Sequence, residues 1–453
     1  MMNRWTRFGL LAALAATPAA AAEPSGPLFV AATSPAGIAF WYRQRTDLPE
    51  ASIAVGWPDG LGMATPGKEA LFLLAPSLLG KGAGERSANE MNESLNDLGA
   101  DADIRSDEWS TTATLAAAPD RLEAAAAIAA TALSDPRLGQ KELDRLRKAA
   151  GDRIRQSQTH GETIAFAAAA KFMYGDAPML RRLDPAALDA ITREDVDIWR
   201  KRVLARQGMV VAASGAPSAA EFGRSIDALL ARLPEKSDLP PVRRPAPAVA
   251  GKTIVVEKEL AQTIILEIAD TGLRQDREQL QSSVAVTVLG GGLESRLSAS
   301  VRQKLGASYG LNAGLSGLPE HKLLGILGPV GNDKALEALE AIGAEYARWR
   351  ADGITAEEFE AARKRIGAQI AGGYAKVGVD TGEFVGAMLV GRPPNDTADA
   401  QQRLDSYTME SVNAAVRAKF SAPPLLTVIV SSKAEGFKAD CVIKDWREAA
   451  GCR

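Results

Sequence analysis

Apolar and polar positions follow two similar series along the chain. Each series opens with a strand-like alternation, "ASIAVGW" at 51–57 and "QTIILEIA" at 262–269. Each also has a run rich in β-branched residues near its end, "GMVVAAS" at 208–214 and "LLTVIVSS" at 425–432. Because period-two alternation buries one face of a strand, these four segments predict one sheet in each half of the chain.

Helical segments between these strands also occur in pairs. The stretch "KELDRLRKAAGDRI" (141–154) resembles "EEFEAARKRIGAQI" (357–370), and both place Arg-Lys shortly before a glycine in an amphipathic pattern. Two further helices end in Leu98-Gly99-Ala100 and Leu305-Gly306-Ala307, where the glycine can adopt the left-handed conformation that closes a helix. Such paired segments indicate an internal duplication.

A proline-rich stretch separates the two series. The segment "LPEKSDLPPVRRPAPAVAGK" at 233–252 favours an extended connection, since proline fixes φ and removes a backbone donor. We therefore predict two units of the α+β class, at 23–232 and 253–453, joined by this linker. Each unit is expected to be a mainly antiparallel sheet with helices packed on one face.

The first residues differ from the rest of the chain. Arg4 and Arg7 precede the apolar run Phe8–Ala16, and Ala20–Ala22 then supply small residues. Residues 1–22 are therefore predicted to be a cleavable secretory signal, and a helical membrane anchor is the alternative. No later stretch is long and apolar enough to span a membrane. The net charge of −3 over 453 residues gives no electrostatic footprint for nucleic acid. The composition and the signal suggest the periplasm.

Only two cysteines, Cys441 and Cys452, are present. An exported chain meets an oxidising compartment, so a disulfide between them is expected; an unpaired, frayed tail is the alternative. Two thiols without nearby histidine or cysteine partners do not predict a metal site.

Conventional catalytic motifs are missing from the sequence. The two histidines, His160 and His321, lie in different halves, whereas a two-histidine zinc motif needs both on one helix face; both are predicted to be solvated loop residues. The sequence contains no G-x-S-x-G elbow, and "GGGLESR" at 290–296 is neither a dinucleotide fingerprint nor a P-loop. We therefore expect no metal in this chain.

One stretch combines a cation with a phenol. In "GGGLESRLSASVRQKLGASYG" (290–310), a helix is predicted from about Glu294 to Gly306, with Arg302 near its end and Tyr309 on the following extended segment. A guanidinium and a phenol on adjacent elements could converge on one ligand. A dipole-stabilised arginine and an ordinary strand tyrosine are the alternative.

This stretch resembles the second-domain signature of the insulinase/pitrilysin-like inverted-motif zinc peptidases, G-G-x-x-S-R-L-x-x-x-L-R-E-x-x-G-L-A-Y. In that family the arginine and tyrosine, seven positions apart, act on substrate at a zinc centre borne by the other domain or subunit. Arg302 and Tyr309 keep this spacing. The resemblance implies the same role for them here.

The first half is similar to the metal-binding domain of the same family. The segment at 78–104 matches its K-G-T-x-x-R-S … L-G-A/G pattern, with Lys81, Gly82, Arg86 and Ser87 in step. Aligned backwards from Lys81, the zinc motif H-x-x-E-H falls on "LLAPS" at 73–77, and the distal glutamate ligand falls near Asp152–Arg153. No ligand is clearly kept, and the replacements are Leu73, Pro76, Ser77 and Arg153.

The resemblance implies a non-zinc subunit of an exported two-chain peptidase. Its partner would be a similar chain that keeps H-x-x-E-H and carries the zinc, and the two would close around a chamber and cut unfolded peptides. Whether the chain pairs with itself or with another chain is left open. The alternative is a catalytically silent binding or scaffold protein, because fold does not fix function. The histidine count excludes a conventional stand-alone zinc peptidase.

Overall fold

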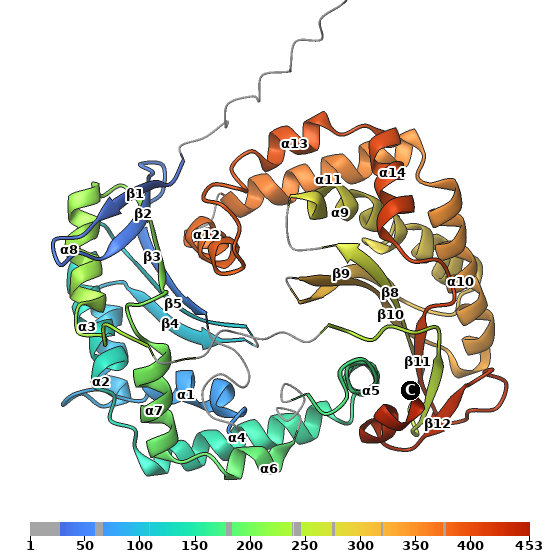
Figure 1. Ribbon diagram of the computed structural model, residues 1–453, viewed down its shortest axis with the longest axis horizontal. Coiled ribbons are helices and arrows are strands. Elements are labelled where there is room, and N and C mark those ends of the chain that lie inside the picture. The colour runs from blue at the N-terminus through green and yellow to red at the C-terminus, as the bar shows by residue number, and fades with distance from the viewer. Residues whose placement is uncertain are drawn as a thin grey trace, which may run out of the picture.

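The computed structural model describes residues 28–58, 67–107, 109–177, 184–237, 239, 246–273, 277–318, 320–374 and 377–453. The predicted secretory signal at 1–22 lies outside these residues, as do positions 238 and 240–245 of the predicted linker. The described residues form two six-stranded sheets with helices, arranged as an open ring (Figure 1). The predicted α+β fold class is confirmed.

The first sheet holds all the strands that precede the linker. Its strands are β1 (Val30–Thr33), β2 (Ala39–Gln44), β3 (Ala51–Pro58), β4 (Asp101–Ser106), β5 (Ser110–Ala117) and β6 (Val210–Gly215). They lie in the order β1-β2-β6-β3-β5-β4, and β2 with β6 is the parallel pair. Strand β3 is central and fully buried up to Trp57 because both faces of the sheet are covered.

The second sheet repeats this plan. Its strands are β7 (Thr253–Glu257), β8 (Thr263–Leu273), β9 (Asn312–Leu318), β10 (His321–Val330), β11 (Leu426–Ser431) and β12 (Cys441–Ile443). The order β12-β7-β11-β8-β10-β9 reproduces β2-β6-β3-β5-β4 in its last five places, as the predicted duplication requires. His321 begins β10, so the expectation that it lies in a loop is wrong.

The sheets differ in their sixth strand. In the first sheet β1 precedes β2 in the chain and runs antiparallel to it, whereas β12 follows β11 and runs parallel to β7. A disulfide between Cys441 and Cys452, with Cα atoms 5.7 Å apart, joins β12 to the C-terminal turn η4 (Trp446–Cys452).

Helices of each half pack on one face of that half's own sheet. Those of the first half are α1 (Leu71–Leu79), α2 (Ala88–Asp97), α3 (Leu122–Ser134), α4 (Gln140–Ser157), α6 (Pro185–Asp189), α7 (Arg193–Val203) and α8 (Ala219–Leu230). Those of the second are α9 (Glu278–Gly290), the π-helix η2 (Ser298–Lys304), the short η3 (Asn332–Lys334), α10 (Ala335–Asp352), α11 (Ala356–Tyr374), α13 (Ala400–Ser406) and α14 (Met409–Lys419). None of the described helices combines the length and apolar character needed to span a membrane.

The remaining two helices cross between the halves. Helix α5 (Gly161–Tyr174) belongs to the first half by sequence but packs against β8 and β11 of the second sheet. Helix α12 (Val379–Leu389) belongs to the second half but packs against β3 and β6 of the first sheet. Both helices are visible on the inner side of the ring in Figure 1. The two halves are therefore joined by exchanged helices as well as by the linker.

A buried carboxylate fixes the start of α12 on the first sheet. The side chain of Asp380 is 1% exposed and accepts a hydrogen bond of 2.6 Å from the Ser214 hydroxyl. The guanidinium groups of Arg43 and Arg45 each lie 3.9 Å from the same carboxylate. Because a buried charge needs such partners, this cluster ties the position of α12 to β2 and β6.

A second contact between the halves involves Phe29, near the start of the described chain. Its backbone N–H donates to the Asn395 side chain (2.8 Å), and its carbonyl accepts from the same side chain (2.9 Å). The Phe29 ring lies 4.4 Å from that of Phe384 on α12. The start of the first half is thus held by the second.

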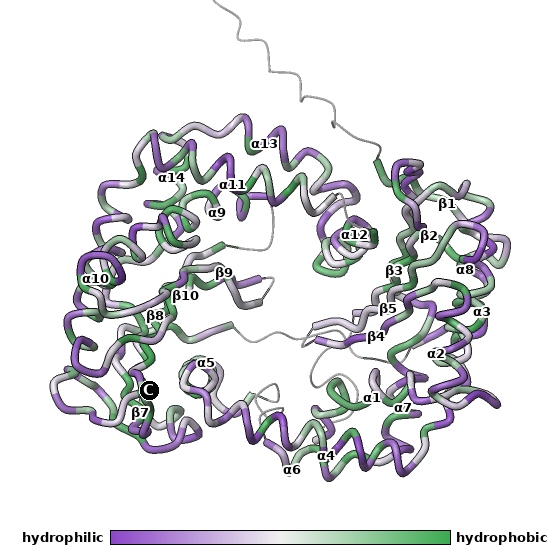
Figure 2. Tube along the Cα trace, turned by 180° about the vertical axis from the view of Figure 1, so that it is seen from behind, coloured by the Kyte–Doolittle hydropathy of each residue, from purple (hydrophilic) through white to green (hydrophobic). Residues whose placement is uncertain are grey.

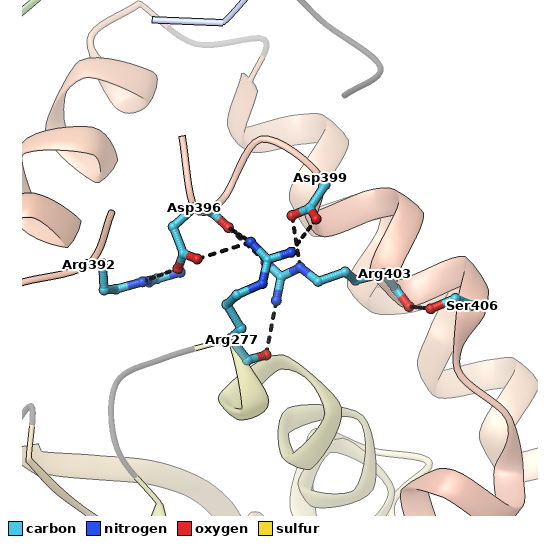
Figure 3. A network of polar contacts seen from close by, with 6 residues as sticks. All are labelled: Arg277, Arg392, Asp396, Asp399, Arg403 and Ser406. Carbon is cyan, nitrogen blue, oxygen red and sulfur yellow. Dashed lines mark hydrogen bonds and ion pairs between the residues drawn. The ribbon is translucent and has the colours of Figure 1, made fainter. Parts of the chain in front are cut away.

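The segment between α12 and α13 is fixed by an arginine–aspartate network (Figure 3). Arg277, at the start of α9, donates to Asp396 (3.0 Å) and to Asp399. Arg403 donates to Asp399 (2.9 Å) and to the Arg277 carbonyl (2.9 Å), while Arg392 pairs with Asp396. The Asp396 side chain is 1% exposed, so removing one arginine would leave a buried charge short of partners.

Candidate functional site

Helix α1 carries three of the four positions at which the zinc ligands and the base would fall. Leu74, Ala75 and Leu78 are buried in the core of the first half, Leu73 is partly buried against it, and Ser77 is exposed. Pro76 is buried inside the helix, where it supplies no backbone donor. Much of the helix is coloured hydrophobic in Figure 2. The segment therefore packs as a core helix.

The structure brings the fourth position, Arg153, onto the helix that packs beside α1. Helix α4 lies against α1, and Arg153 is on its exposed side. Leucine and proline offer no metal ligand, serine offers only a hydroxyl, and arginine carries a positive charge, so this set does not fit a zinc ion. Among the described residues, no three His, Cys, Asp or Glu side chains gather as a metal site.

A pocket of about 330 Å³ opens beside the C-terminal end of α1. Its lining is largely aliphatic and comes from α1, α2, α3, α4, α8, β4 and β5, and it includes two of the replaced positions, Pro76 and Ser77. We call it the α1 pocket. Its lining residues are Pro76, Ser77, Gly80, Lys81, Met91, Asn92, Leu95, Ala102, Asp103, Ile104, Ala113, Thr114, Leu115, Ala129, Ala132, Leu133, Leu146 and Leu229.

Arg302 lies on a π-helix in the second half. The helix predicted from about Glu294 begins at Arg296, and it is π-helical over Ser298–Lys304. Such helices are rare and often mark functional sites. The guanidinium of Arg302 is partly exposed, and no hydrogen bond or ion pair engages it within the described structure.

Tyr309 is displayed to solvent from a fixed backbone. Its side chain is 87% exposed, whereas the neighbouring Ala307 and Leu311 are buried. The Ser308 hydroxyl donates to the Pro329 carbonyl (2.6 Å) and accepts from the Gly310 N–H (3.1 Å). The phenol is therefore directed outward by its neighbours and has no partner of its own among the described residues.

The turn between Arg302 and Tyr309 forms as predicted. Gly306 has φ of +61°, and Gly99, the corresponding glycine of the first half, has φ of +61° as well. A left-handed backbone of this kind favours glycine over residues with a Cβ atom. The same local geometry thus follows α2 and η2.

Arg296 is a structural residue of this region to which the sequence analysis assigned no role. Its guanidinium donates twice to Glu358 (both 2.7 Å) and once to the Gly353 carbonyl (2.8 Å). The hydrogen bond to Glu358 raises the pKa of Arg296. Burial alone would raise the pKa of the Glu358 carboxyl group, but the hydrogen bonds from Arg296 and Thr355 hold that pKa below its usual range. These hydrogen bonds anchor the residues just before the π-helix to α10 and α11. The sequence signal that could have indicated a role for Arg296 is its place in the S-R-L part of the motif.

The structure therefore places the predicted site residues in two sets. The replaced ligand positions lie on α1 and α4 of the first half, whereas Arg302 lies on η2 and Tyr309 follows it in the second half. In Figure 1, α1 and β9 lie in different halves of the ring. The partly exposed Arg302 and the exposed Tyr309 are accessible to a ligand or to another chain.

Comparison with known proteins finds similar sequences and similar folds. The family described as "Peptidase M16 inactive domain" matches residues 190–366. An uncharacterized zinc protease of Streptomyces coelicolor is 22% identical over 363 residues, which is 78% of each chain.

Solved structures share the fold along nearly the whole chain. A peptidase M16 inactive domain from Pseudomonas fluorescens has a TM-score of 0.80 at 20% identity and covers 90% of this chain and 98% of its own. A protease from Helicobacter pylori has a TM-score of 0.79 at 13% identity, covering 90% of this chain and all of its own. The periplasmic protease PqqL from Escherichia coli has a TM-score of 0.76 at 14% identity, covering 95% of this chain and 49% of its own.

The inactive-domain match and the shared two-sheet fold confirm the resemblance predicted from the Arg302 and Tyr309 signature: the chain has an insulinase-like, M16 peptidase fold.

Proposed function

We propose that this chain is the non-zinc subunit of an exported two-chain metallopeptidase. The observation that carries the proposal is a contrast. Helix α1 offers no imidazole or carboxylate ligand, whereas the side chains of the partly exposed Arg302 and the exposed Tyr309 have no partner in the described structure. Exposed donors held on a fixed backbone suit a ligand supplied from outside. The partner would be a similar chain that keeps H-x-x-E-H, and the substrates would be unfolded peptides.

The two donors would act where charge develops on the scissile carbonyl. The guanidinium of Arg302 would give charge-assisted hydrogen bonds to the peptide backbone or carboxylate, and the Tyr309 hydroxyl would donate to the oxyanion. The partner's zinc would supply the activated water. Donors fixed before the reaction need no reorganisation during it, which is where their catalytic value comes from.

The secretory signal and the periplasmic location are part of the proposal. The disulfide between Cys441 and Cys452 supports them, because such bonds persist in oxidising compartments. A catalytically silent scaffold remains the second candidate. The loss of every zinc ligand at Leu73, Pro76, Ser77 and Arg153 favours it, since a chain used only for assembly needs none.

Reconstitution with a zinc-bearing relative distinguishes the two candidates. We expect Tyr309→Phe to lower the turnover of a quenched peptide by the two-chain complex by about 10²–10³-fold. Size-exclusion chromatography should show unchanged assembly, because the exposed hydroxyl packs against nothing in this chain. Unchanged turnover by the Tyr309→Phe complex would reject the catalytic role and favour the scaffold.

A further inference from the structure

The α1 pocket has a hydrocarbon interior and a polar mouth. Met91, Leu95, Leu133 and Leu229 are buried around it, and no aromatic side chain lines it among the described residues. Since its deep lining offers aliphatic groups, entry of a peptide backbone would leave amide groups without hydrogen bonds. The interior therefore suits a plain alkyl chain.

The mouth carries one uncompensated cation. Lys81 lines the pocket and is partly exposed, and no hydrogen bond or ion pair engages its ammonium group in the described structure. The carboxylate of Asp103, also at the mouth, already accepts from Arg105. The remaining polar side chains of the lining, Ser77, Asn92 and Thr114, are neutral, and Ser77 and Asn92 are exposed. Charge complementarity thus favours a ligand with a single negative charge.

We propose that the α1 pocket binds a medium-chain aliphatic carboxylate, with the alkyl chain inside and the carboxylate at Lys81. A volume of about 330 Å³ holds roughly ten groups of the size of a water molecule, taking about 30 Å³ for each. The pocket volume is therefore larger than that of a single leucine side chain and close to that of an alkyl chain of about ten carbons. The site is separate from Arg302 and Tyr309, and the inference does not depend on the proposed peptidase role.

Decanoate is the probe for this site, measured by isothermal titration calorimetry on the full chain. We expect saturable one-to-one binding with a dissociation constant below about 1 mM. Decyltrimethylammonium, with the same chain and the opposite charge, should bind at least about tenfold more weakly. No saturable binding of decanoate, or equal binding of the two probes, would overturn the proposal.

Two variants locate the site. Ala132→Phe, which places a ring in the pocket, should weaken decanoate binding by more than tenfold, with an unchanged circular dichroism spectrum as the check on folding. Lys81→Gln should weaken decanoate binding by about fivefold. Lys438→Gln, which removes an exposed cation elsewhere, should leave it unchanged.

Unchanged affinity for decanoate in a folded Ala132→Phe or Lys81→Gln protein would overturn the assignment of the site.

A competition experiment tests whether the pocket binds a peptide instead. If a short peptide with a C-terminal leucine displaced decanoate and bound more tightly, the pocket would be a peptide site and the proposal would be wrong. Failure of that peptide to compete supports the aliphatic carboxylate.

Discussion

The two halves of the molecule share one plan but differ at and after the helices α2 and η2. When the two sequences are aligned at Gly99 and Gly306, the ends of α2 and η2 coincide. In this alignment Leu95 corresponds to Arg302, and Ala102 corresponds to Tyr309. Leu95 and Ala102 line the α1 pocket. Arg302 and Tyr309 instead face solvent or lie at the surface. The same scaffold thus offers an apolar cavity in one half and exposed donors in the other.

This difference shows which features the fold needs and which it does not. Helix α1 is held in place because Leu74 and Leu78 fill the core, so its packing does not require metal ligands. The side chains of Arg302 and Tyr309 contribute no hydrogen bond within the described structure. Their presence is therefore not explained by stability, which is the reason to assign them to function.

The largest expected effect tests whether Arg302 differs from an ordinary surface cation. In the complex with a zinc-bearing relative, Arg302→Ala should lower kcat/KM for a peptide by about 10²-fold, because a charge-assisted hydrogen bond to substrate is lost. Lys304→Ala, an exposed cation on the same π-helix, is the matched control and should stay near wild type. Equal losses in the two variants would show a general charge effect.

A second contrast lies in the sheets. Glu267 on β8 is 6% exposed, and one of its carboxyl oxygens is buried without a hydrogen-bond partner. Burial raises the pKa of this carboxyl group from 4.5 to about 7. No acidic residue is buried in the described strands of the first sheet. The folded state therefore holds this proton more tightly than the unfolded state does. Stability should fall as pH rises from about 4.5 to about 7 and then stay reduced.

The variant Glu267→Gln should remove this pH dependence. Above pH 7 it should be more stable than the parent chain by about 3 kcal/mol, from about 1.4 kcal/mol per pKa unit. Urea unfolding at pH 5 and pH 8 measures the difference, with the exposed Glu435→Gln as control. Parallel curves for the parent chain and Glu267→Gln at the two pH values would show that Glu267 is not buried as a neutral acid.

The exchanged helices give a third test. A Cβ atom on Gly56 of β3 would lie 2.4 Å from Val385 and 2.7 Å from Leu389 of α12. Gly56→Ala should therefore destabilise the protein by about 1–3 kcal/mol through overpacking. Gly386→Ala, on α12 itself but with open space around it, should stabilise by up to about 1 kcal/mol. Thermal unfolding compares them, and similar melting temperatures would mean that α12 does not pack tightly on β3.

The smallest effect concerns the start of α2. Ser87 and Glu90 form a capping box there, in which the Ser87 N–H donates to the Glu90 carboxylate at 2.7 Å. The N-cap residue of η2, Leu297, forms no side-chain cap, and the Ser298 N–H makes only a long bond of 3.4 Å to the Ser295 hydroxyl. Ser87→Ala should cost about 1 kcal/mol of unfolding free energy. Ser300→Ala, inside η2, should cost less. A reversed order in chemical denaturation would contradict the difference between the two helices.

Much of the fold could be predicted because its signals are local. Alternation at 51–57 and 262–269 became β3 and β8, and the glycine stops at 99 and 306 adopt the expected left-handed backbone. The exchange of α5 and α12 could not be predicted, since an alanine-rich helix such as α5 can pack on either sheet and nothing in its pattern says which. That choice is made by tertiary contacts such as those at Gly161 and Asp380.

The candidate site was predictable by resemblance and spacing rather than by pattern. The seven-residue interval between Arg302 and Tyr309 survived, although the helix between them is π-helical and not α-helical. The α1 pocket was not foreseen, because a cavity depends on how seven elements meet and on the small side chains of Ala129 and Ala132. The pairing of Arg296 with Glu358 could not be predicted either, because the two residues lie on different elements that are far apart in sequence.

Peptide hydrolysis by the purified chain, with and without its zinc-bearing relative, tests the central claim most directly. The account predicts no turnover of a quenched peptide by this chain alone and chelator-sensitive turnover when the two are combined. Chelator-sensitive hydrolysis by this chain in the absence of any second polypeptide would contradict it.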